Sequence, residues 1–402
     1  MDPRSHIPFM EFPEDVQLCT LSFLSPSTIA AFARTSKRSL SLCSGDSGNP
    51  LWHALCDRRW GSKTLISQWG QGKISFKLLY RTLSVWDSLI GFWRIIPRSS
   101  LSSVAFMAAL VLFEWGPTFL VGSRVSPSSR NGEYGVVKSP FLLMSLSPTG
   151  EAVYFLDQDG KSTRFPSVEE ARDWGLTPVN VSFMGASHFL VEEKFLASGD
   201  EEDDSGDLIR QRKRRMLRWT WDPQHFLKIL NCSPTSSRPL QGLWKGIGAD
   251  AKLDIYLVTY NESGGISCRR VGDSSVVRAL GRSLIVFYTL ESSCIMPPYS
   301  PEELFRYESR VHHGVLADYS SCPSAANDNS LVVSSILFCY SSFNQLAPDV
   351  DEGARENSHL RKKGRIWRYR DGTFGFGFLK DNLIIDLKPF TGKDQFLEPD
   401  KH

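Results

Sequence analysis

The sequence has few of the patterns that mark metal and redox sites. Its eight cysteines are scattered over 402 residues, and no two stand in C-x-x-C spacing, so neither a zinc site nor a dithiol motif is expected. His312 and His313 have no third ligand at metal spacing, and no phosphate-binding loop G-x-x-x-x-G-K-[ST] occurs. We therefore expect no metal and no cofactor, and we interpret the two histidines as part of a polar loop.

Catalytic motifs are also lacking. Residues 45–50, GDSGNP, are similar to the sequence around the nucleophile of chymotrypsin-like proteases. This chemistry needs a histidine base and an aspartate that orients it, and in that family both precede the serine. The only histidine before Ser47 is His6, which lies in an expected tail. Residues 246–251 fit the loose form G-x-G-x-x-A, but a strand-like segment follows where a dinucleotide site needs a helix. We expect a protein that is not an enzyme and has no catalytic residues.

Charge of one sign and long apolar runs are scarce as well. The formal net charge is only +2, which gives no general attraction to nucleic acid or to an acidic membrane surface. The longest apolar run, residues 104–113, is too short to span a bilayer and predicts a buried strand. No signal peptide is evident at the N-terminus. We expect free thiols, a cytoplasmic or nuclear location, and neither a nucleic acid nor a membrane as partner.

Residues 12–60 carry the clearest helix signals in the chain. Pro13 stands where a first helical turn tolerates proline, and Glu14 places negative charge at the positive end of the helix dipole. Ser25 and Pro26 predict the start of a second helix. The first helix is apolar on two sides and needs two packing partners. Two alternatives stay open: the helices cap the downstream domain, or one apolar side binds a separate protein.

Three motifs in this stretch, F-P-E-D-V, L-S-F-L-S-P and I-A-A-F-A-R-T-S-K, resemble an F-box. The F-box is the small helical module that docks a substrate receptor onto the adaptor and cullin of an SCF-type ubiquitin ligase. Residues 51–60, LWHALCDRRW, are similar to the segment that commonly follows it. The chain departs from the family at Phe12, where leucine is usual, and at Ser39 and Leu40, where a tryptophan often stands.

The resemblance implies a Skp-type adaptor as direct partner and a cullin as indirect partner. It also implies that residues 12 to about 37 face the adaptor, while residues 51–60 face the downstream domain. The adaptor-binding residues that it implies are Phe12, Pro13, Val16, Leu21, Leu24 and Ile29.

We predict an α+β chain in which an all-helical part is followed by a mainly antiparallel β-barrel domain. After residue 90, short apolar segments alternate with turn signals such as Gly116–Pro117 and Asp371–Gly372, which is typical of an antiparallel barrel or sandwich. We expect this domain to fold alone. The expected parts are a flexible tail (1–11), the F-box and following helix (12–60), a helical linker (61–89), the β-barrel domain (90–390) and a second tail (391–402).

Two long insertions are predicted to be disordered. Residues 347–363 are polar, and residues 199–218 carry an acidic block followed by a basic one, which is typical of a solvated loop. The basic run, residues 210–218, is also compatible with a nuclear import signal.

Two sites in the β-domain share the form G-apolar-W-base. They begin at Gly91 and Gly242 and place Trp93 and Trp244 two residues later. One interpretation is an internal duplication that gives two barrels. We favour a single large barrel split by the charged loop, in which each tryptophan plugs one end and each glycine permits a tight backbone.

The G-x-W segments and the C-terminal FGFGFLKDNLIIDLKPF together resemble the β-barrel substrate domain of F-box receptors that include a vertebrate cyclin-D-directed member. We identify the chain as a divergent, plant-like member of these receptors. The resemblance implies a non-catalytic subunit that presents an unknown protein target. Trp93, Trp244 and Arg269 are candidate substrate-binding residues, although a structural role is the better explanation of both tryptophans. The alternative function is a lipocalin-like small-ligand-binding barrel with a helical extension.

Overall fold

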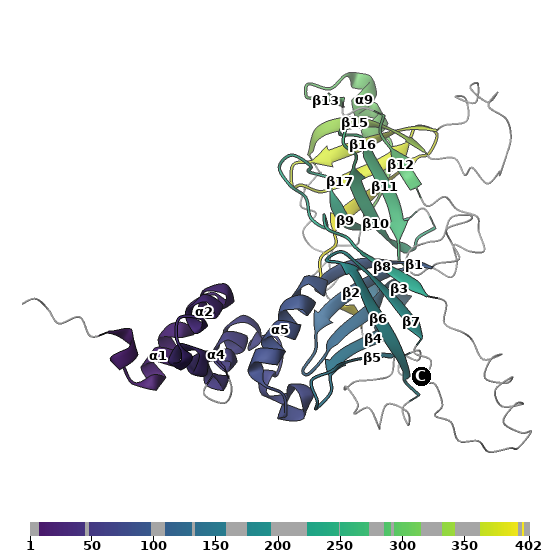
Figure 1. Cartoon of the computed structure of the whole chain (residues 1–402). Helices are drawn as coiled ribbons and strands as arrows, with labels where there is room; N and C mark the ends of the chain where they lie inside the picture. Colours follow the sequence, from purple (N-terminus) through teal and green to yellow (C-terminus); the bar gives the residue numbers. More distant parts are fainter. Residues whose placement is uncertain are drawn as a thin grey trace, which may run out of the picture.

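The computed structural model describes residues 8–44, 48–97, 109–130, 133–157, 175–193, 223–248, 250–272, 285–290, 293–314, 332–341, 362–392 and 396–397. A helical arm leads into a first β-barrel, and a second β-barrel stands on the first (Figure 1). The predicted class, a helical N-terminal part followed by antiparallel barrel structure, is confirmed. Within the described residues, no helix is both long enough and apolar enough to cross a membrane.

The helices of the arm begin where the sequence places capping residues. The side chains of Ser25, Ser36 and Ser75 each accept a hydrogen bond from the backbone N–H three residues ahead, which satisfies one free donor at a helix start. Pro13 precedes the first helix as its N-cap. The elements are η1 (Phe9–Glu11), α1 (Glu14–Leu21), α2 (Pro26–Ala33), α3 (Lys37–Cys43), α4 (Asn49–Trp60), η2 (Ile66–Gly72), α5 (Phe76–Trp86) and η3 (Asp87–Leu89).

Two details of the arm differ from the expectation. The predicted flexible tail is shorter, because η1 is ordered by the Phe9 ring, which packs edge-on against Phe32 at 5.7 Å between centroids. The pair Asn49–Pro50 is typical of an N-cap followed by a first-turn proline, but Asn49 lies inside α4, and its side-chain oxygen accepts a hydrogen bond from the backbone N–H of Phe76 at 3.1 Å. Asn49 therefore joins α4 to α5 instead of capping its own helix.

The first β-domain is a closed antiparallel barrel, here called barrel 1. Its strands pair in chain order, β8 returns to β1, and β4 is long enough to pair with both β3 and β5. The strands are β1 (Gly91–Pro97), β2 (Leu110–Trp115), β3 (Leu120–Arg130), β4 (Glu133–Leu146), β5 (Ala152–Leu156), β6 (Thr177–Gly185), β7 (His188–Glu193) and β8 (Gln224–Lys228). The sequence analysis missed β6, β7 and β8.

The second β-domain, barrel 2, closes independently of the first. β9 pairs with β10 and β18, and β12 pairs with β15, so the ring is complete without a strand of barrel 1. The single large barrel that we favoured is therefore wrong, and two barrels are present. The ring strands are β9 (Gly242–Ile247), β10 (Leu253–Tyr260), β11 (Ile266–Val271), β12 (Ile285–Tyr288), β15 (Val333–Ser341), β16 (Lys363–Tyr369), β17 (Phe374–Phe378) and β18 (Leu383–Pro389).

Each barrel starts with the same local device. Gly91 and Gly242 have φ angles of 114° and 125°, a region that favours glycine. The fully buried indoles of Trp93 and Trp244 each donate a hydrogen bond to the carbonyl oxygen four residues earlier, that of Leu89 at 2.6 Å and that of Leu240 at 2.8 Å. Each tryptophan therefore lies at the start of its own barrel, and the two do not close a single barrel as predicted.

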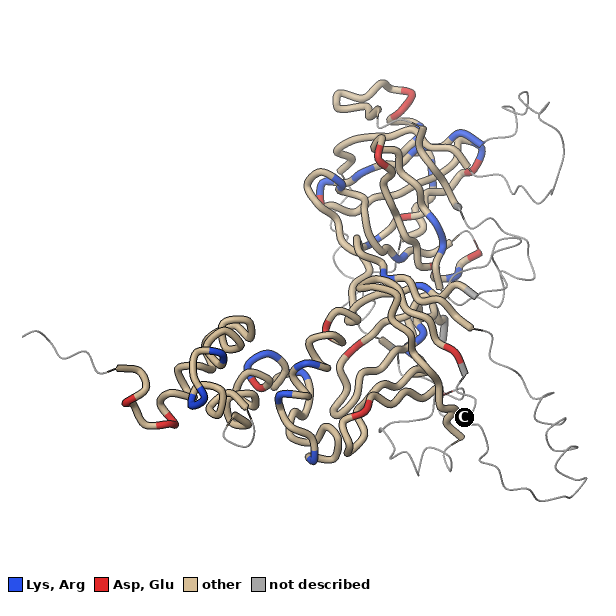
Figure 2. Tube along the Cα trace, in the orientation of Figure 1, with Lys and Arg blue, Asp and Glu red and all other residues tan. Residues whose placement is uncertain are grey.

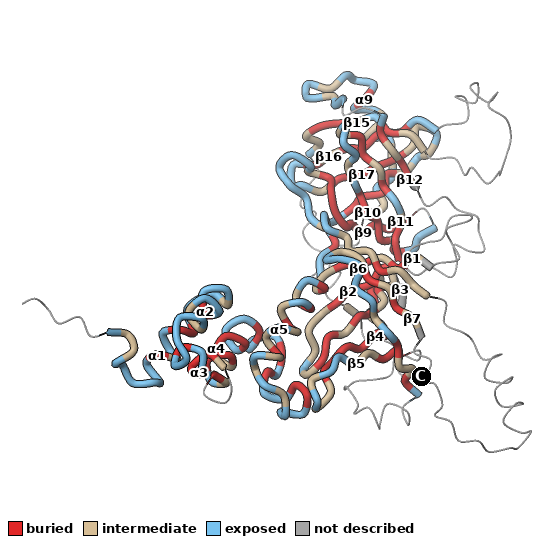
Figure 3. Tube along the Cα trace, in the orientation of Figure 1, coloured by how far each residue is buried: buried red, intermediate tan, exposed pale blue. Residues whose placement is uncertain are grey.

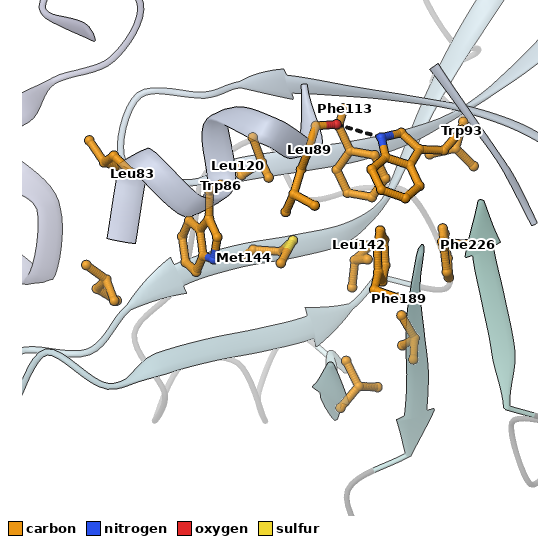
Figure 4. Close-up of a cluster of buried hydrophobic side chains, with 14 of the residues drawn as sticks. Leu83, Trp86, Leu89, Trp93, Phe113, Leu120, Leu142, Met144, Phe189 and Phe226 are labelled. Atoms are coloured by element: carbon orange, nitrogen blue, oxygen red, sulfur yellow. Dashed lines mark hydrogen bonds between the residues drawn. The ribbon is translucent and has the colours of Figure 1, made fainter. Parts of the chain in front are cut away.

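Barrel 1 and the helical linker share one hydrophobic core. Trp86 lies beside Met144, Leu89 lies between Trp86 and Trp93, and Leu83 belongs to the same cluster (Figure 4). The same cluster extends through η2 and the end of α4. The expected boundary at residue 90 therefore does not separate two cores, because the helices close one end of barrel 1.

A second shared core joins the two barrels. It includes Phe92 and Leu112 on the outer face of barrel 1, and Leu243 and Leu257 on that of barrel 2. The C-terminal segment seals this contact through Phe390 and then adds β19 (Phe396–Leu397) to β4 in parallel. The expected C-terminal tail at 391–402 is thus partly incorporated into barrel 1.

An outer layer covers part of barrel 2. It consists of β13 (Cys294–Ile295), α9 (Pro301–Glu308) and β14 (Val311–His313). His312 belongs to a strand parallel to β18 and not to a polar loop, and its Nδ1 lies 2.9 Å from Asp386 Oδ2. The charged segment 199–218, residues 45–47 and most of 347–363 lie outside the described residues, although Lys363 begins β16.

Candidate functional site

The helical arm has a small core of its own. Leu21 and Ile29, both predicted to bind the adaptor, are 2% and 1% exposed and pack with Leu51, Trp52 and Leu55 of α4. Their side chains therefore hold the helices together and are not on the surface. This reassigns two of the six predicted adaptor-binding residues to packing.

The other four predicted residues lie on the surface of the arm. The exposed fractions of Phe12, Val16 and Leu24 are 38%, 41% and 37%, and Pro13 is also exposed. Phe23, which the prediction omitted, is 71% exposed. Figure 3 shows that most residues of α1 and α2 are exposed, while α4 carries buried residues. We call these five residues the docking surface.

Polar contacts fix the backbone of the docking surface. Arg58 of α4 donates hydrogen bonds to the carbonyl and the hydroxyl of Ser22, and its guanidinium lies 4.5 Å from the centroid of the Phe23 ring. The fully buried Gln17 donates through Nε2 to the Phe12 carbonyl at 2.6 Å. Arg58 thus holds the turn after α1, and Gln17 holds the segment before it.

α4 connects the docking surface to barrel 1. Trp52 in the core of the arm and Trp60 in the core of barrel 1 contact opposite sides of Tyr80, at centroid distances of 5.5 and 5.2 Å. Burial raises the pKa of the Cys56 thiol to about 12, so this cysteine stays neutral inside the joint. The expectation that residues 51–60 set the angle of the β-domain remains a prediction, which this packing supports.

An ion pair closes the joint at its far end. Arg59 donates to Asp87 at 2.8 Å, and the Trp60 indole donates to the same carboxylate at 3.2 Å. Burial alone would raise the pKa of Asp87, but these hydrogen bonds outweigh burial and lower it below its ordinary value. Asp87 is therefore charged at neutral pH and ties α4 to η3.

Comparison with known proteins agrees with this geometry. The model of the F-box domain matches residues 9–49. An F-box protein of Arabidopsis thaliana is 41% identical over 428 aligned positions, covering 96% of each chain. The chain belongs to the F-box protein family. The family model ends at the start of α4 and does not cover the barrels of this F-box protein, whereas the Arabidopsis relative is aligned over 96% of the chain.

A solved structure also shows a distant similarity to this F-box protein. It is a protein of unknown function from the DUF3598 family of Nostoc punctiforme, 10% identical, with 75% of this chain and 95% of that chain covered. Its TM-score of 0.14 is too low to carry an argument about fold or function.

The predicted substrate-binding residues of this F-box protein lie apart from one another. Trp93 and Trp244 are inside different barrels and fully buried, so neither lines an exposed surface. Arg269 is exposed on the outside of barrel 2, beside the shared core. Burial and the nearby charge of Arg269 together lower the pKa of Arg94 on β1.

A pocket of about 220 Å³ opens in barrel 2, at the end opposite Trp244. Trp244 contacts Phe374 at the start of β17, whereas the pocket is lined by the end of that strand. Its wall consists of Val286, Phe376, Gly377, Phe378, Leu383 and Ile385, and its charged lining residues are Asp250, Arg270 and Asp381. Sequence reasoning missed this pocket because four strands and two turns contribute to it.

The rim of the pocket is held from both sides. Arg310 donates to the carbonyl oxygens of Phe378 and Asp381, at 3.4 and 3.2 Å, and so fixes the β17–β18 turn. On the other side, the hydroxyl of Tyr134 from barrel 1 donates to the Ala251 carbonyl at 2.8 Å. The pocket is thus shaped before any ligand arrives, which lowers the entropic cost of binding.

Proposed function

We propose that this F-box protein is the substrate-recognition subunit of an SCF-type ubiquitin ligase. In this role the docking surface binds a Skp-type adaptor and, through it, a cullin, while the barrels hold a protein target. The F-box domain and the F-box relative support a substrate-receptor role. The chain would supply no catalytic residue, because its contribution is to raise the effective concentration of the target near the ubiquitin carrier.

The observation that carries the proposal is the exposed apolar docking surface. The arm already has a closed core, yet Phe12, Val16, Phe23 and Leu24 remain between 37% and 71% exposed. Covering each such side chain with a partner contributes up to about 1.5–3 kcal/mol. An apolar group of this kind on a small helical module is typical of a protein-binding surface.

The contacts between successive apolar cores, from the arm to barrel 1 and from barrel 1 to barrel 2, support the positioning role. A receptor must hold its target at a set distance and angle from the ligase, and flexible joints would reduce the effective concentration. The core of the arm meets the core of barrel 1 at Tyr80, and barrel 1 meets barrel 2 through a third apolar core. The packing therefore favours a single stiff unit from α1 to barrel 2.

The alternative, a lipocalin-like protein for small ligands, accounts for the barrels but not for the docking surface. Aromatic side chains occupy the described interior of barrel 1. The pocket of barrel 2, at about 220 Å³, is below the roughly 300–1,000 Å³ that is usual for small-molecule sites. We therefore favour the receptor. Mass spectrometry of denatured purified protein would reveal a bound small molecule and so favour the alternative.

Adaptor affinity tests the proposal directly. The double substitution Pro13→Ala with Leu24→Ala removes apolar contact area from the docking surface without touching the core of the arm. We expect a loss of affinity for a Skp-type adaptor of at least about tenfold, measured by calorimetry with the full chain. The control is Val85→Ala, which removes a 56% exposed side chain from α5 and should leave the affinity unchanged. Equal affinities for all three proteins would overturn the proposal.

A further inference from the structure

Two arginines stand at the edge of the apolar core that joins the barrels. Arg94 lies on the outer face of β1 with Phe92 and Ile96, and Arg269 lies on the outer face of β11 opposite Leu257 of β10. The core takes buried side chains from β1 to β4 of barrel 1 and from β9 to β11 of barrel 2, so β1 and β11 are its outermost strands. Arg269 is exposed and Arg94 is half-buried, so both guanidinium groups reach solvent beside the contact.

The two guanidinium groups border the same contact from opposite barrels. Leu110, the register partner of Arg94, and Leu257, the register partner of Arg269, belong to one apolar cluster. Burial, and after it the charge of Arg269, lowers the pKa of Arg94, so the two charges are close enough to repel each other. Such repulsion is relieved when an anion lies between the two groups.

No carboxylate belongs to the described strand neighbours of either arginine. Arg94 faces Leu110 on β2 and Leu227 on β8, and Arg269 faces Leu257 on β10. These neighbours are uncharged. Among the described residues, no carboxylate lies within ion-pair distance of either guanidinium, and the charge that acts on Arg94 is that of Arg269.

The carboxylates farther along the neighbouring strands are already paired with other cations. Glu114 of β2 lies 2.7 Å from the Nζ of Lys138 on β4. Asp254 of β10 points into barrel 2, where its Oδ2 lies 3.2 Å from Arg270. Counting these groups therefore adds two balanced pairs and leaves the positive charge of Arg94 and Arg269 without an offset among the described residues.

We propose that Arg94 and Arg269 together bind an oxyanion on the target protein, carried by a carboxylate or a phosphoryl side chain. Guanidinium groups bind both kinds of oxyanion through parallel N–H···O hydrogen bonds. β1 lies where the two barrels meet (Figure 1), so a segment bound there contacts both barrels. The apolar core holds the two arginines at a set separation before binding, which lowers the entropic cost. This inference rests on the proposed receptor function and adds the chemical class of the recognised segment.

The test uses the full chain and three blocked alanine-based pentapeptides that differ at two positions. Both positions hold glutamate in the first peptide, glutamine in the second and phosphoserine in the third. Ligand-observed NMR titrations at low ionic strength measure the three affinities. We expect the glutamate peptide to bind about tenfold more tightly than the glutamine peptide, and the phosphoserine peptide to bind at least as tightly as the glutamate peptide. A further preference for phosphoserine would assign the oxyanion to a phosphoryl group, and equal affinities would assign it to a carboxylate.

Matched variants locate the effect. Arg94→Gln and Arg269→Gln should each weaken the glutamate peptide about threefold. The control, Arg370→Gln, removes an exposed charge from the end of β16, across the ring of barrel 2 from β10, and should change nothing. Arg269→Glu changes an exposed position and places a carboxylate beside Arg94, so it should abolish the preference for the glutamate peptide. This variant keeps the test decisive if Arg94→Gln lowers the melting temperature.

Three results would overturn the inference. They are equal affinities for the glutamate and glutamine peptides, an equal loss of affinity in the Arg370→Gln control, and an undiminished preference for glutamate in Arg269→Glu. The adaptor affinity of the unaltered chain is measured separately. Adaptor binding without a preference for the glutamate peptide would reject the oxyanion site alone, and the reverse result would reject the receptor function alone.

Discussion

Barrel 1 and barrel 2 have the same strand connectivity and the same starting motif, but their ends are closed differently. Helical residues such as Trp86 and Leu89 cover the starting end of barrel 1 and share its core. At barrel 2, Leu240 and the short segment before β9 cover the corresponding end. At the opposite end of barrel 2 a pocket opens. One architecture thus anchors the F-box arm in barrel 1 and holds a pocket in barrel 2.

The outer faces of the barrels differ too. The core of the contact between barrel 1 and barrel 2 consists of apolar side chains, and the Tyr134 hydroxyl adds a hydrogen bond to Ala251. The opposite face of barrel 2 carries charge beneath α9, where Glu303 accepts hydrogen bonds from Arg365 at 2.8 and 3.1 Å while both residues are buried. Figure 2 shows other charged residues spread over both barrels. The apolar face joins barrel 2 to barrel 1, and the Glu303–Arg365 ion pair orients α9 over the opposite face.

The largest expected effect comes from removing the helices. A fragment that starts at residue 90 lacks eight buried side chains of the shared core, a loss on the order of 10 kcal/mol. The residues are Cys56, Trp60, Ile66, Trp69, Leu79, Leu83, Trp86 and Leu89. We expect amide hydrogens of barrel 1 to lose protection in hydrogen exchange, while those of barrel 2 keep it. A fragment that starts at residue 48 is the control. Protection of barrel 1 in the shorter fragment would show that the barrel does not need the helices.

The second-largest effect is expected from substitution of the buried tryptophan at the start of each barrel, and it should differ between the two barrels. Trp93→Ala and Trp244→Ala each leave a cavity, with a cost of about 3–5 kcal/mol. Because α5 packs against the core that contains Trp93, only Trp93→Ala should also increase hydrogen exchange in α5. The measurement is exchange followed by peptide mass spectrometry. Equal effects of both variants on α5 would contradict the difference between the two ends.

The two barrels also show which parts of the fold could be predicted from the sequence. Helix starts at Ser25 and Ser75 and barrel starts at Gly91 and Gly242 depend on short-range chemistry, and they were predictable. The number of barrels was not, because ring closure depends on pairs such as β12 with β15, more than forty residues apart. Long-range strand pairing leaves no local signal.

The buried ion pair under α9 gives the third prediction. Glu303→Gln leaves Arg365 without its counter-charge and should cost about 3 kcal/mol, measured by urea unfolding at neutral pH. The control, Glu302→Gln, changes a carboxylate whose side chain is 72% exposed and should cost less than about 1 kcal/mol. Similar losses for both would mean that burial of the pair is unimportant.

The same glutamate predicts a pH dependence. Burial alone would raise the pKa of Glu303, but hydrogen bonds from Arg365 and Arg306 lower it below its ordinary value. A depressed carboxyl pKa in the folded state contributes stability above the ordinary value of about 4.3, and this contribution is lost as the pH falls through the folded-state pKa. Unfolding free energy should therefore fall more steeply below about pH 4 in the unaltered chain than in Glu303→Gln.

The smallest effect is expected at the contact between the barrels. Tyr134→Phe removes one hydrogen bond to the Ala251 carbonyl and should lower the unfolding free energy by about 1 kcal/mol or less. The β9–β10 turn should exchange its amide hydrogens faster. An unchanged exchange rate there would indicate that the apolar core alone fixes the two barrels.

The docking surface was only partly predictable for a related reason. Helical spacing places Val16 and Leu24 on one apolar side of α1 and Leu21 on a second, but it does not decide which side faces α4. The structure buries Leu21 and leaves Val16 and Leu24 exposed. Arg58 and Gln17 could not be found in the sequence, because each donates a hydrogen bond to a backbone carbonyl, Arg58 after α1 and Gln17 before it.

The receptor function has one most direct test, a quantitative comparison of the proteins that co-purify with two forms of the full chain. The forms are the unaltered protein and the double variant Pro13→Ala with Leu24→Ala. We predict that adaptor and cullin are depleted from the variant, while a target bound by the barrels is retained in both. Undiminished adaptor and cullin on the variant would contradict the assignment of the docking surface and with it the proposed receptor.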